Sequence, residues 1–179
     1  MKGLTEYTLP IQGLKNGLHT YKFKVNKAFF THFENSPIEN GLFDLTVILD
    51  KRDSILELDF DFEGHIATDC DRCTNAIQLP FGGYQKLIIK RIDEDVDEDV
   101  DIIFLSPDVF EFNIAKYVYE FICLSMPFNK VYDCENDNPR PCNMDILTRL
   151  GFFDTPSVSE PKKSKKNPFD DLRNMFNDN

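Results

Sequence analysis

The stretch Leu56-Glu-Leu-Asp-Phe-Asp-Phe-Glu63 alternates apolar and acidic side chains without a break. Successive side chains of a β-strand point to opposite faces, so this pattern predicts a strand with one buried face and one wetted face. A second alternating run, Phe43–Leu49, precedes it across the polar turn Asp50–Asp53. Together the two runs predict a hairpin within an antiparallel sheet that has one face in water.

The sequence on either side of this hairpin predicts more strands. They fall at residues 4–11, 18–25, 77–92 and 102–105. Asn26 is suited to cap a short helix, Lys27–Glu34, between the second and third strands. Glycines interrupt the alternation at Gly64, which predicts a bulge or bend, and at Gly82–Gly83, which predict a turn or bulge.

One longer helix is predicted at Ile114–Met126, where apolar residues recur with helical spacing. Asn113 is placed to cap it, Phe112 to pack against Tyr117, and Pro127 to end it. The apolar stripe should lie on the sheet. We therefore expect four side chains to be buried together: Phe60, Phe62, Phe121 and Ile122.

The predicted fold class is α+β: a curved antiparallel sheet or open barrel, one main helix packed on it, short accessory helices and a disordered C-terminal tail. One accessory helix is expected at Met144–Leu150. Residues 154–167 are rich in Pro, Ser and Lys, the composition of a flexible linker. The expected organisation is a single domain at residues 1–153, followed by a flexible basic linker and short motif at residues 154–179.

The composition predicts a globular cytoplasmic protein. Of its 179 residues, 41% are hydrophobic, yet no apolar run approaches the roughly 20 residues that cross a bilayer, and no signal peptide is evident. A net charge of −11 argues against wrapping a polyanion. The charge is segregated, however, and the acidic run Asp93–Asp101 is expected to be a solvated loop whose role the sequence leaves open.

Four cysteines form two pairs, Cys70/Cys73 and Cys134/Cys142. Four thiolates suffice for a closed tetrahedral zinc site, and Cys-x-x-Cys on a turn is standard ligand spacing, so one structural zinc is predicted. One alternative is four free cysteines. Another is a redox pair at Cys70/Cys73, but this needs a helix after the first thiol, and Asp69 and Asp71 would raise the pKa of Cys70. Cys123 is expected to lie in the core.

The sequence shows no catalytic triad, phosphate loop or nucleotide fingerprint, so a binding protein without catalytic activity is expected. Basic and apolar side chains are the candidates for contact with RNA or protein. They are Lys22, Lys24, Arg72, Lys162, Lys163, Lys165, Lys166, Phe169 and Leu172.

Four segments of the chain resemble the YceD family, the large ribosomal RNA subunit accumulation proteins, a family long described as a domain of unknown function. They are Gly64-x5-Cys70-Asp-Arg-Cys73, the helix Asn113–Leu124 with Leu124-Ser-Met-Pro127, the Cys134…Cys142 segment, and Asn167-Pro-Phe-x-x-Leu172. The helix after the second cysteine pair resembles the Bacteroidetes branch, which is bacterial. The resemblance implies a role in ribosome biogenesis: support of large-subunit rRNA accumulation or processing, through rRNA, a ribosomal protein or an assembly factor. Neither a membrane nor a small-molecule substrate is expected among the protein's partners. The alternatives are a thiol redox protein and a protein-interaction adaptor without RNA contact.

Overall fold

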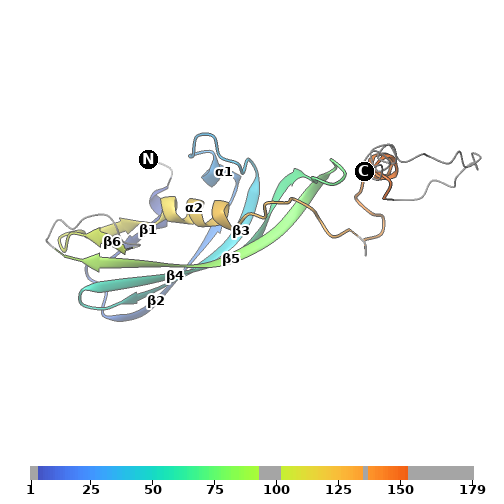
Figure 1. Ribbon diagram of the computed structural model, residues 1–179. Helices are drawn as coiled ribbons and strands as arrows, with labels where there is room; N and C mark the ends of the chain where they lie inside the picture. The colour runs from blue at the N-terminus through green and yellow to red at the C-terminus, as the bar shows by residue number, and fades with distance from the viewer. Residues whose placement is uncertain (1–3, 93–101, 135–136, 153–179) are drawn as a thin grey trace, which may run out of the picture. The chain divides into compact units, whose positions relative to one another are not determined.

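A computed structural model describes residues 4–92, 102–134 and 137–152 (Figure 1). The chain divides into two compact units, Met1–Asn143 and Met144–Asn179. The strands of the first unit are β1 (Thr8–Pro10), β2 (Gly17–Val25), β3 (Gly41–Lys51), β4 (Ile55–Asp69), β5 (Ala76–Arg91), β6 (Ile102–Leu105) and β7 (Glu111–Asn113). Its helices are η1 (Thr5–Tyr7, a 3₁₀ turn), α1 (Lys27–Phe30) and α2 (Ala115–Ser125).

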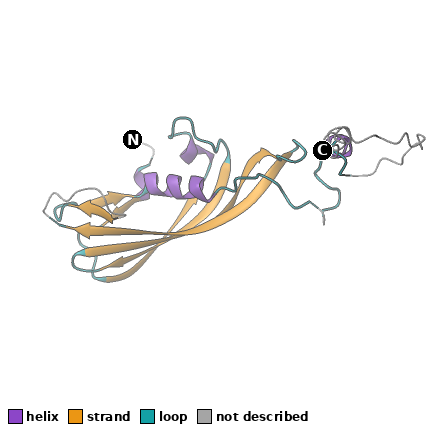
Figure 2. Ribbon diagram, in the orientation of Figure 1, coloured by secondary structure: helices purple, strands orange, loops and turns teal. Residues whose placement is uncertain are grey.

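The main sheet has five strands in the order β2-β3-β4-β5-β6 (Figure 2). The pairs from β2 to β5 are antiparallel, and the predicted hairpin is confirmed with Val47 opposite Phe60. The expectation of a purely antiparallel sheet is wrong at one edge, because β6 pairs parallel to β5. The sheet is therefore mixed and open, and the α+β class is confirmed.

The alternation in β4 places its apolar side chains against α2, which lies across one face of the sheet (Figure 1). Phe60 is fully buried and its ring meets Phe121 with centroids 5.1 Å apart. Phe62 and Ile122 are buried as predicted, whereas Phe121 is only half-buried. The N-cap position of α2 is Ile114 and not Asn113 as predicted, because the helix begins one residue later, but Asn113 Oδ1 still accepts a hydrogen bond from the backbone N–H of Ala115 at 3.0 Å.

The bulge predicted as one possibility at Gly64 and the turn or bulge predicted at Gly82–Gly83 are wrong. Both β4 and β5 pass through them with continuous pairing, in which Gly64 faces Phe43 and Phe81. A Cβ on Gly64 would lie 2.1 Å from the carbonyl oxygen of Leu42, so glycine lets β3 and β4 approach closely. A Cβ on Gly83 would meet Ser125 Oγ at 2.6 Å, so glycine there lets the end of α2 rest on β5.

The N-terminal segment differs from its prediction. Instead of one strand at residues 4–11, it forms η1 and then β1, which pairs with β7 in a separate two-stranded sheet. Asn26 caps α1 by accepting from Ala28 N–H at 2.9 Å, but this helix ends at Phe30, earlier than predicted. Tyr7 packs on Phe29 with ring centroids 4.9 Å apart, which joins η1 to α1.

The second unit contributes the helix α3, Met144–Arg149, close to its predicted bounds. The acidic run Asp93–Asp101 and the linker and motif predicted at residues 154–179 lie outside the described residues. In the part of the chain that the structure describes, no helix has both the length and the apolar character needed to span a membrane.

Candidate functional site

The turn between β4 and β5 carries Cys70 and Cys73, as predicted. It is closed by two backbone hydrogen bonds of 2.8 Å, from Cys70 N–H to Asn75 O and from Thr74 N–H to Cys70 O. Thr74 has a φ of 55°, a left-handed conformation that reverses the chain tightly. The turn therefore holds both cysteines on a fixed backbone.

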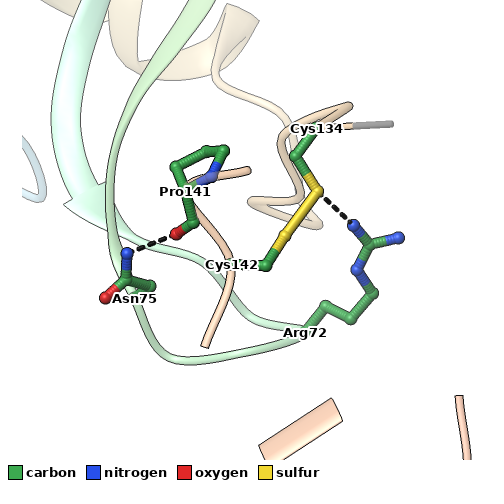
Figure 3. The surroundings of a disulfide bond; sticks show 5 residues. All are labelled: Arg72, Asn75, Cys134, Pro141 and Cys142. Atoms are coloured by element: carbon green, nitrogen blue, oxygen red, sulfur yellow. Dashed lines mark hydrogen bonds between the residues drawn. A yellow bond between two sulfur atoms is a disulfide. The ribbon is translucent and has the colours of Figure 1, made fainter. Parts of the chain in front are cut away.

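The described residues of the segment 128–142, which comes after α2, fold back onto this turn. Asp71 and Lys130 exchange two hydrogen bonds: Asp71 N–H donates to Lys130 O at 2.9 Å, and Lys130 N–H donates to Asp71 Oδ2 at 2.7 Å. On the other side of the turn, Asn75 Nδ2 donates to the carbonyl oxygen of Pro141 (Figure 3). We call the turn, residues 70–75, and the described residues of 128–142 the cysteine end.

These contacts bring all four predicted cysteines into one region. Cys70 and Cys73 are buried free thiols, 3% and 1% exposed. Cys134 and Cys142 are joined in a disulfide, with Cα atoms 7.1 Å apart. Arg72 Nη2 donates to Cys134 Sγ at 3.1 Å across 62 positions of sequence (Figure 3). The side chain of Arg72 thus links the turn directly to the second cysteine pair.

Hydrogen bonds to sulfur determine the acidity of Cys70. Burial raises the pKa of its thiol, but the backbone N–H groups of Arg72, Cys73 and Tyr132 and the thiol of Cys73 bring this pKa below its ordinary value. The sequence argument expected Asp69 and Asp71 to raise it, and this expectation is wrong. The Asp71 carboxylate is instead occupied by the Lys130 N–H.

Cys123 lies on α2, apart from this arrangement, as a half-buried free thiol. Burial raises its pKa, a hydrogen bond with Tyr119 lowers it and the charge of Glu120 raises it. With Cys134 and Cys142 bonded to each other, no group of three or more His, Cys, Asp or Glu side chains within the described residues is arranged to hold a metal ion. The zinc ligand set stays a prediction.

Of the described basic side chains predicted to contact a partner, two lie on the same face of β2 and the third lies on the β4–β5 turn. Lys22 is exposed on β2, Lys24 pairs with Asp44 at 2.8 Å, and Arg72 faces the disulfide. The remaining candidates, Lys162, Lys163, Lys165, Lys166, Phe169 and Leu172, lie outside the described residues. The described ones therefore do not form one basic patch.

The wetted face of the sheet is crossed by ion pairs. Lys86 Nζ lies 3.3 Å from Asp59 and 3.4 Å from Glu57, and the Tyr84 hydroxyl donates to Asp59 at 2.6 Å. The hydrogen bond with Asp59 is the main reason that the pKa values of Lys86 and Tyr84 are raised. These contacts neutralise part of the negative charge of the acidic side chains on the wetted face of β4.

Sequence reasoning missed two further features of the surface. Leu124, at the end of α2, is 78% exposed, and Phe128, just beyond it, is 97% exposed. The helical stripe indicated a buried face but gave no sign that apolar residues continue onto the surface. A hollow of about 680 Å³ also lies where β4 and β5 extend past the end of β3, lined in part by Ser36, Glu39 and Asp69.

Comparisons of the chain with protein-family models, with curated proteins and with solved structures found no match.

Proposed function

We propose that this protein is a non-enzymatic ribosome-assembly factor that supports large-subunit rRNA accumulation by binding a ribosomal protein or assembly factor. The proposal combines the resemblance of the sequence to the YceD family with one observation, the exposure of Leu124 and Phe128. Both residues lie in or directly after Leu124-Ser-Met-Pro127, a segment that carries the resemblance. They would form the contact with the partner.

Two exposed apolar side chains only four positions apart in the chain favour a protein partner. Burying a Leu or Phe side chain against a partner stabilises a complex by roughly 1.5–3 kcal/mol. Aromatic residues are also enriched among the contacts that dominate binding energy. Leu124 lies in the last turn of α2, Ser125 ends the helix and Met126 is its C-cap, so Phe128 follows two positions after the cap. Burial of these two side chains would therefore supply binding energy of the magnitude that the main contacts of a protein interface supply.

Charge favours the same kind of partner over direct binding of RNA. The chain carries a net charge of −11, and the described basic candidates Lys24 and Arg72 already have partners. A polyanion requires concentrated positive charge, whereas a ribosomal protein rich in Lys and Arg is attracted by an acidic surface. Direct RNA binding is the competing outcome of the test below.

The test is complementation of cells depleted of the protein, with the ratio of large- to small-subunit rRNA as the readout. Depletion should lower this ratio and the wild-type chain should restore it. The double variant Leu124→Ser/Phe128→Ser should fail to restore it. The matched control is Leu18→Ser/Phe110→Ser, which removes two apolar side chains that are 73% and 65% exposed elsewhere on the first unit. This control should restore the ratio fully.

Affinity capture with the same chains identifies the partner. Wild type and control should retain a ribosomal protein or assembly factor that the Leu124→Ser/Phe128→Ser variant loses. An rRNA ratio that does not respond to depletion would overturn the proposed function. Ultraviolet crosslinking of the chain to rRNA, together with full complementation by the Leu124→Ser/Phe128→Ser variant, would overturn the protein contact in favour of direct RNA binding.

A further inference from the structure

We propose that β2, the edge strand of the main sheet, pairs antiparallel with β2 of a second copy of this chain, so that two five-stranded sheets join into one continuous sheet. The partner at this edge is therefore another copy of the same protein. The inference goes beyond the proposed function, which does not require it and relies on Leu124 and Phe128 instead.

The first support is the open edge of β2. This strand is nine residues long and stands at one end of the strand order, so within the described residues it pairs only with β3 (Figure 2). An unpaired edge presents a row of N–H and C=O groups that can pair with another strand. The opposite side of the sheet is less suited, because β6 has four residues and the stretch of β5 beyond it contains Pro80, which has no N–H.

The second support is the direction of the backbone groups of β2. In an antiparallel pair, every second residue turns its N–H and C=O away from the neighbouring strand. The carbonyl oxygen of Lys24 accepts a hydrogen bond from the Tyr7 hydroxyl at 3.1 Å, so Lys24 is one of the residues that face away from β3. Leu18, Thr20 and Lys22 share this orientation, because they precede Lys24 at even spacing. These three residues therefore present backbone donors and acceptors to a second strand.

Tyr7 also determines the register. Its hydroxyl binds the backbone at the end of β2 and its ring stacks on Phe23 with centroids 5.3 Å apart, so the open part of the edge runs from Leu18 to Lys22. A two-fold pairing centred on Thr20 uses this part alone. In it, Thr20 faces Thr20 of the second copy, and Leu18 faces Lys22 of the second copy. Threonine pairs across antiparallel strands are favourable.

The third support is the fit of the side chains in this register. Leu18 is 73% exposed, and the aliphatic part of Lys22 of the second copy would cover it. Asp50 on β3 lies opposite Leu18, so the ammonium group of that Lys22 would approach a carboxylate. Lysines often keep edge strands apart. Here Lys24 already pairs with Asp44 at 2.8 Å, whereas Lys22 makes no ion pair within the described part of the chain and gains an acidic neighbour in the dimer.

Sedimentation of the full chain over a range of concentrations tests the proposal. Wild type should show a reversible equilibrium between monomer and dimer. Thr20→Pro removes one N–H donor from each copy but no hydrogen bond to β3, so it should raise the dimer dissociation constant roughly 30-fold. Thr20→Val is the matched control, because it keeps the N–H and a β-branched side chain, and it should dimerise as wild type does. Far-UV circular dichroism checks that both variants retain the sheet.

Disulfide trapping tests the register and needs no proline. Residues that exchange both hydrogen bonds in an antiparallel pair have Cα atoms about 5.5 Å apart, a separation that a disulfide spans. Thr20→Cys, oxidised with a small disulfide, should form a covalent dimer joined at position 20, identified by mass spectrometry. Leu18→Cys and Lys22→Cys are the controls. Each should form little dimer alone, whereas a mixture of the two should crosslink.

Two results would overturn the proposal. One is wild type that stays monomeric up to about 1 mM, including the case in which another protein then protects the β2 amides from hydrogen exchange, which would favour a foreign strand at this edge. The other is a Thr20→Cys variant that crosslinks no better than Leu18→Cys or Lys22→Cys alone. Neither result bears on the rRNA ratio, so failure here is distinguishable from failure of the proposed function.

Discussion

The sheet core and the cysteine end are held together by different forces. In the core, strand alternation buries whole rings, such as Phe43 and Phe60, which are fully shielded from water. At the cysteine end, a few hydrogen bonds and sulfur contacts join the β4–β5 turn to a segment some 60 positions away. Apolar burial depends on area and tolerates many sequences, whereas these polar contacts depend on specific atoms. We infer that the core determines the fold and that the contacts of the cysteine end can open without unfolding it.

The largest expected effect comes from emptying the core. Phe60→Ala removes a fully buried ring that packs against Phe121, so it should lower the free energy of unfolding by about 3–5 kcal/mol. Urea unfolding followed by circular dichroism measures this loss. Phe128→Ala, at a 97% exposed position, is the control and should change stability by less than about 0.5 kcal/mol. Similar losses in the two variants would contradict the contrast between core and surface.

A smaller loss is expected where two strand backbones come into contact. In Gly64→Ala the new Cβ would lie 2.1 Å from the carbonyl oxygen of Leu42, so β3 and β4 must shift apart, at a cost of about 1–3 kcal/mol. Gly41→Ala is the control, because its Cβ would meet only side-chain atoms, at 3.1 Å or more. Urea midpoints of the two variants give the comparison. A greater loss in Gly41→Ala would disprove this account of Gly64.

Tyr7 links η1 to the core. Its hydroxyl makes the free energy of unfolding depend on pH in the alkaline range. Burial, with a smaller effect of Glu6, raises its pKa from 10.0 to about 12. An acid whose pKa is raised by folding stabilises the protein fully below pH 10, and this stabilisation is lost as pH rises toward 12. Tyr7→Phe also removes the hydrogen bond from the hydroxyl to Lys24 O, at a cost of about 1 kcal/mol at neutral pH.

The measurement for Tyr7 is urea unfolding at pH 8 and pH 11. Wild type should lose stability between these two conditions, and Tyr7→Phe should lose distinctly less. Tyr84→Phe is the control, because its ring lies on the wetted face and is 61% exposed. It should leave most of the alkaline loss in place. Equal pH dependence in wild type and Tyr7→Phe would rule out Tyr7 as its source.

The same contrast explains what sequence reasoning found and what it missed. Alternation predicted β3, β4 and the burial of Phe60, because a period of two follows directly from strand geometry. It failed at Gly64, because a glycine that lets two backbones approach looks the same in sequence as one that forms a bulge. It also missed the pairing of β1 with β7, two strands of three residues each, too short for a period to show.

At the candidate site, Cys-x-x-Cys predicted the turn but not what surrounds it. The folding of the described residues of 128–142 onto the turn depends on backbone groups such as Lys130 N–H and Pro141 O. Every residue type except proline carries both an N–H and a C=O group. No side-chain pattern encodes such partners. The exposure of Phe128 was missed for a related reason, since an apolar residue after a helix reads equally well as core or as surface.

The smallest effect on global stability should come from Asp71, and it tests whether the cysteine end is separable from the core. Asp71→Ala removes the carboxylate that accepts from Lys130 N–H but leaves the sheet untouched. The free energy of global unfolding should therefore change by less than about 0.5 kcal/mol, because the lost contact lies on an exposed side chain. Locally, losing about 1 kcal/mol should speed hydrogen exchange at the Lys130 amide roughly fivefold. Asp71→Asn keeps an oxygen acceptor and is the matched control, with exchange closer to wild type. Exchange that accelerates equally at Lys130 and at core amides such as Phe60 would show that the two regions open together, and the separation between them would then be wrong.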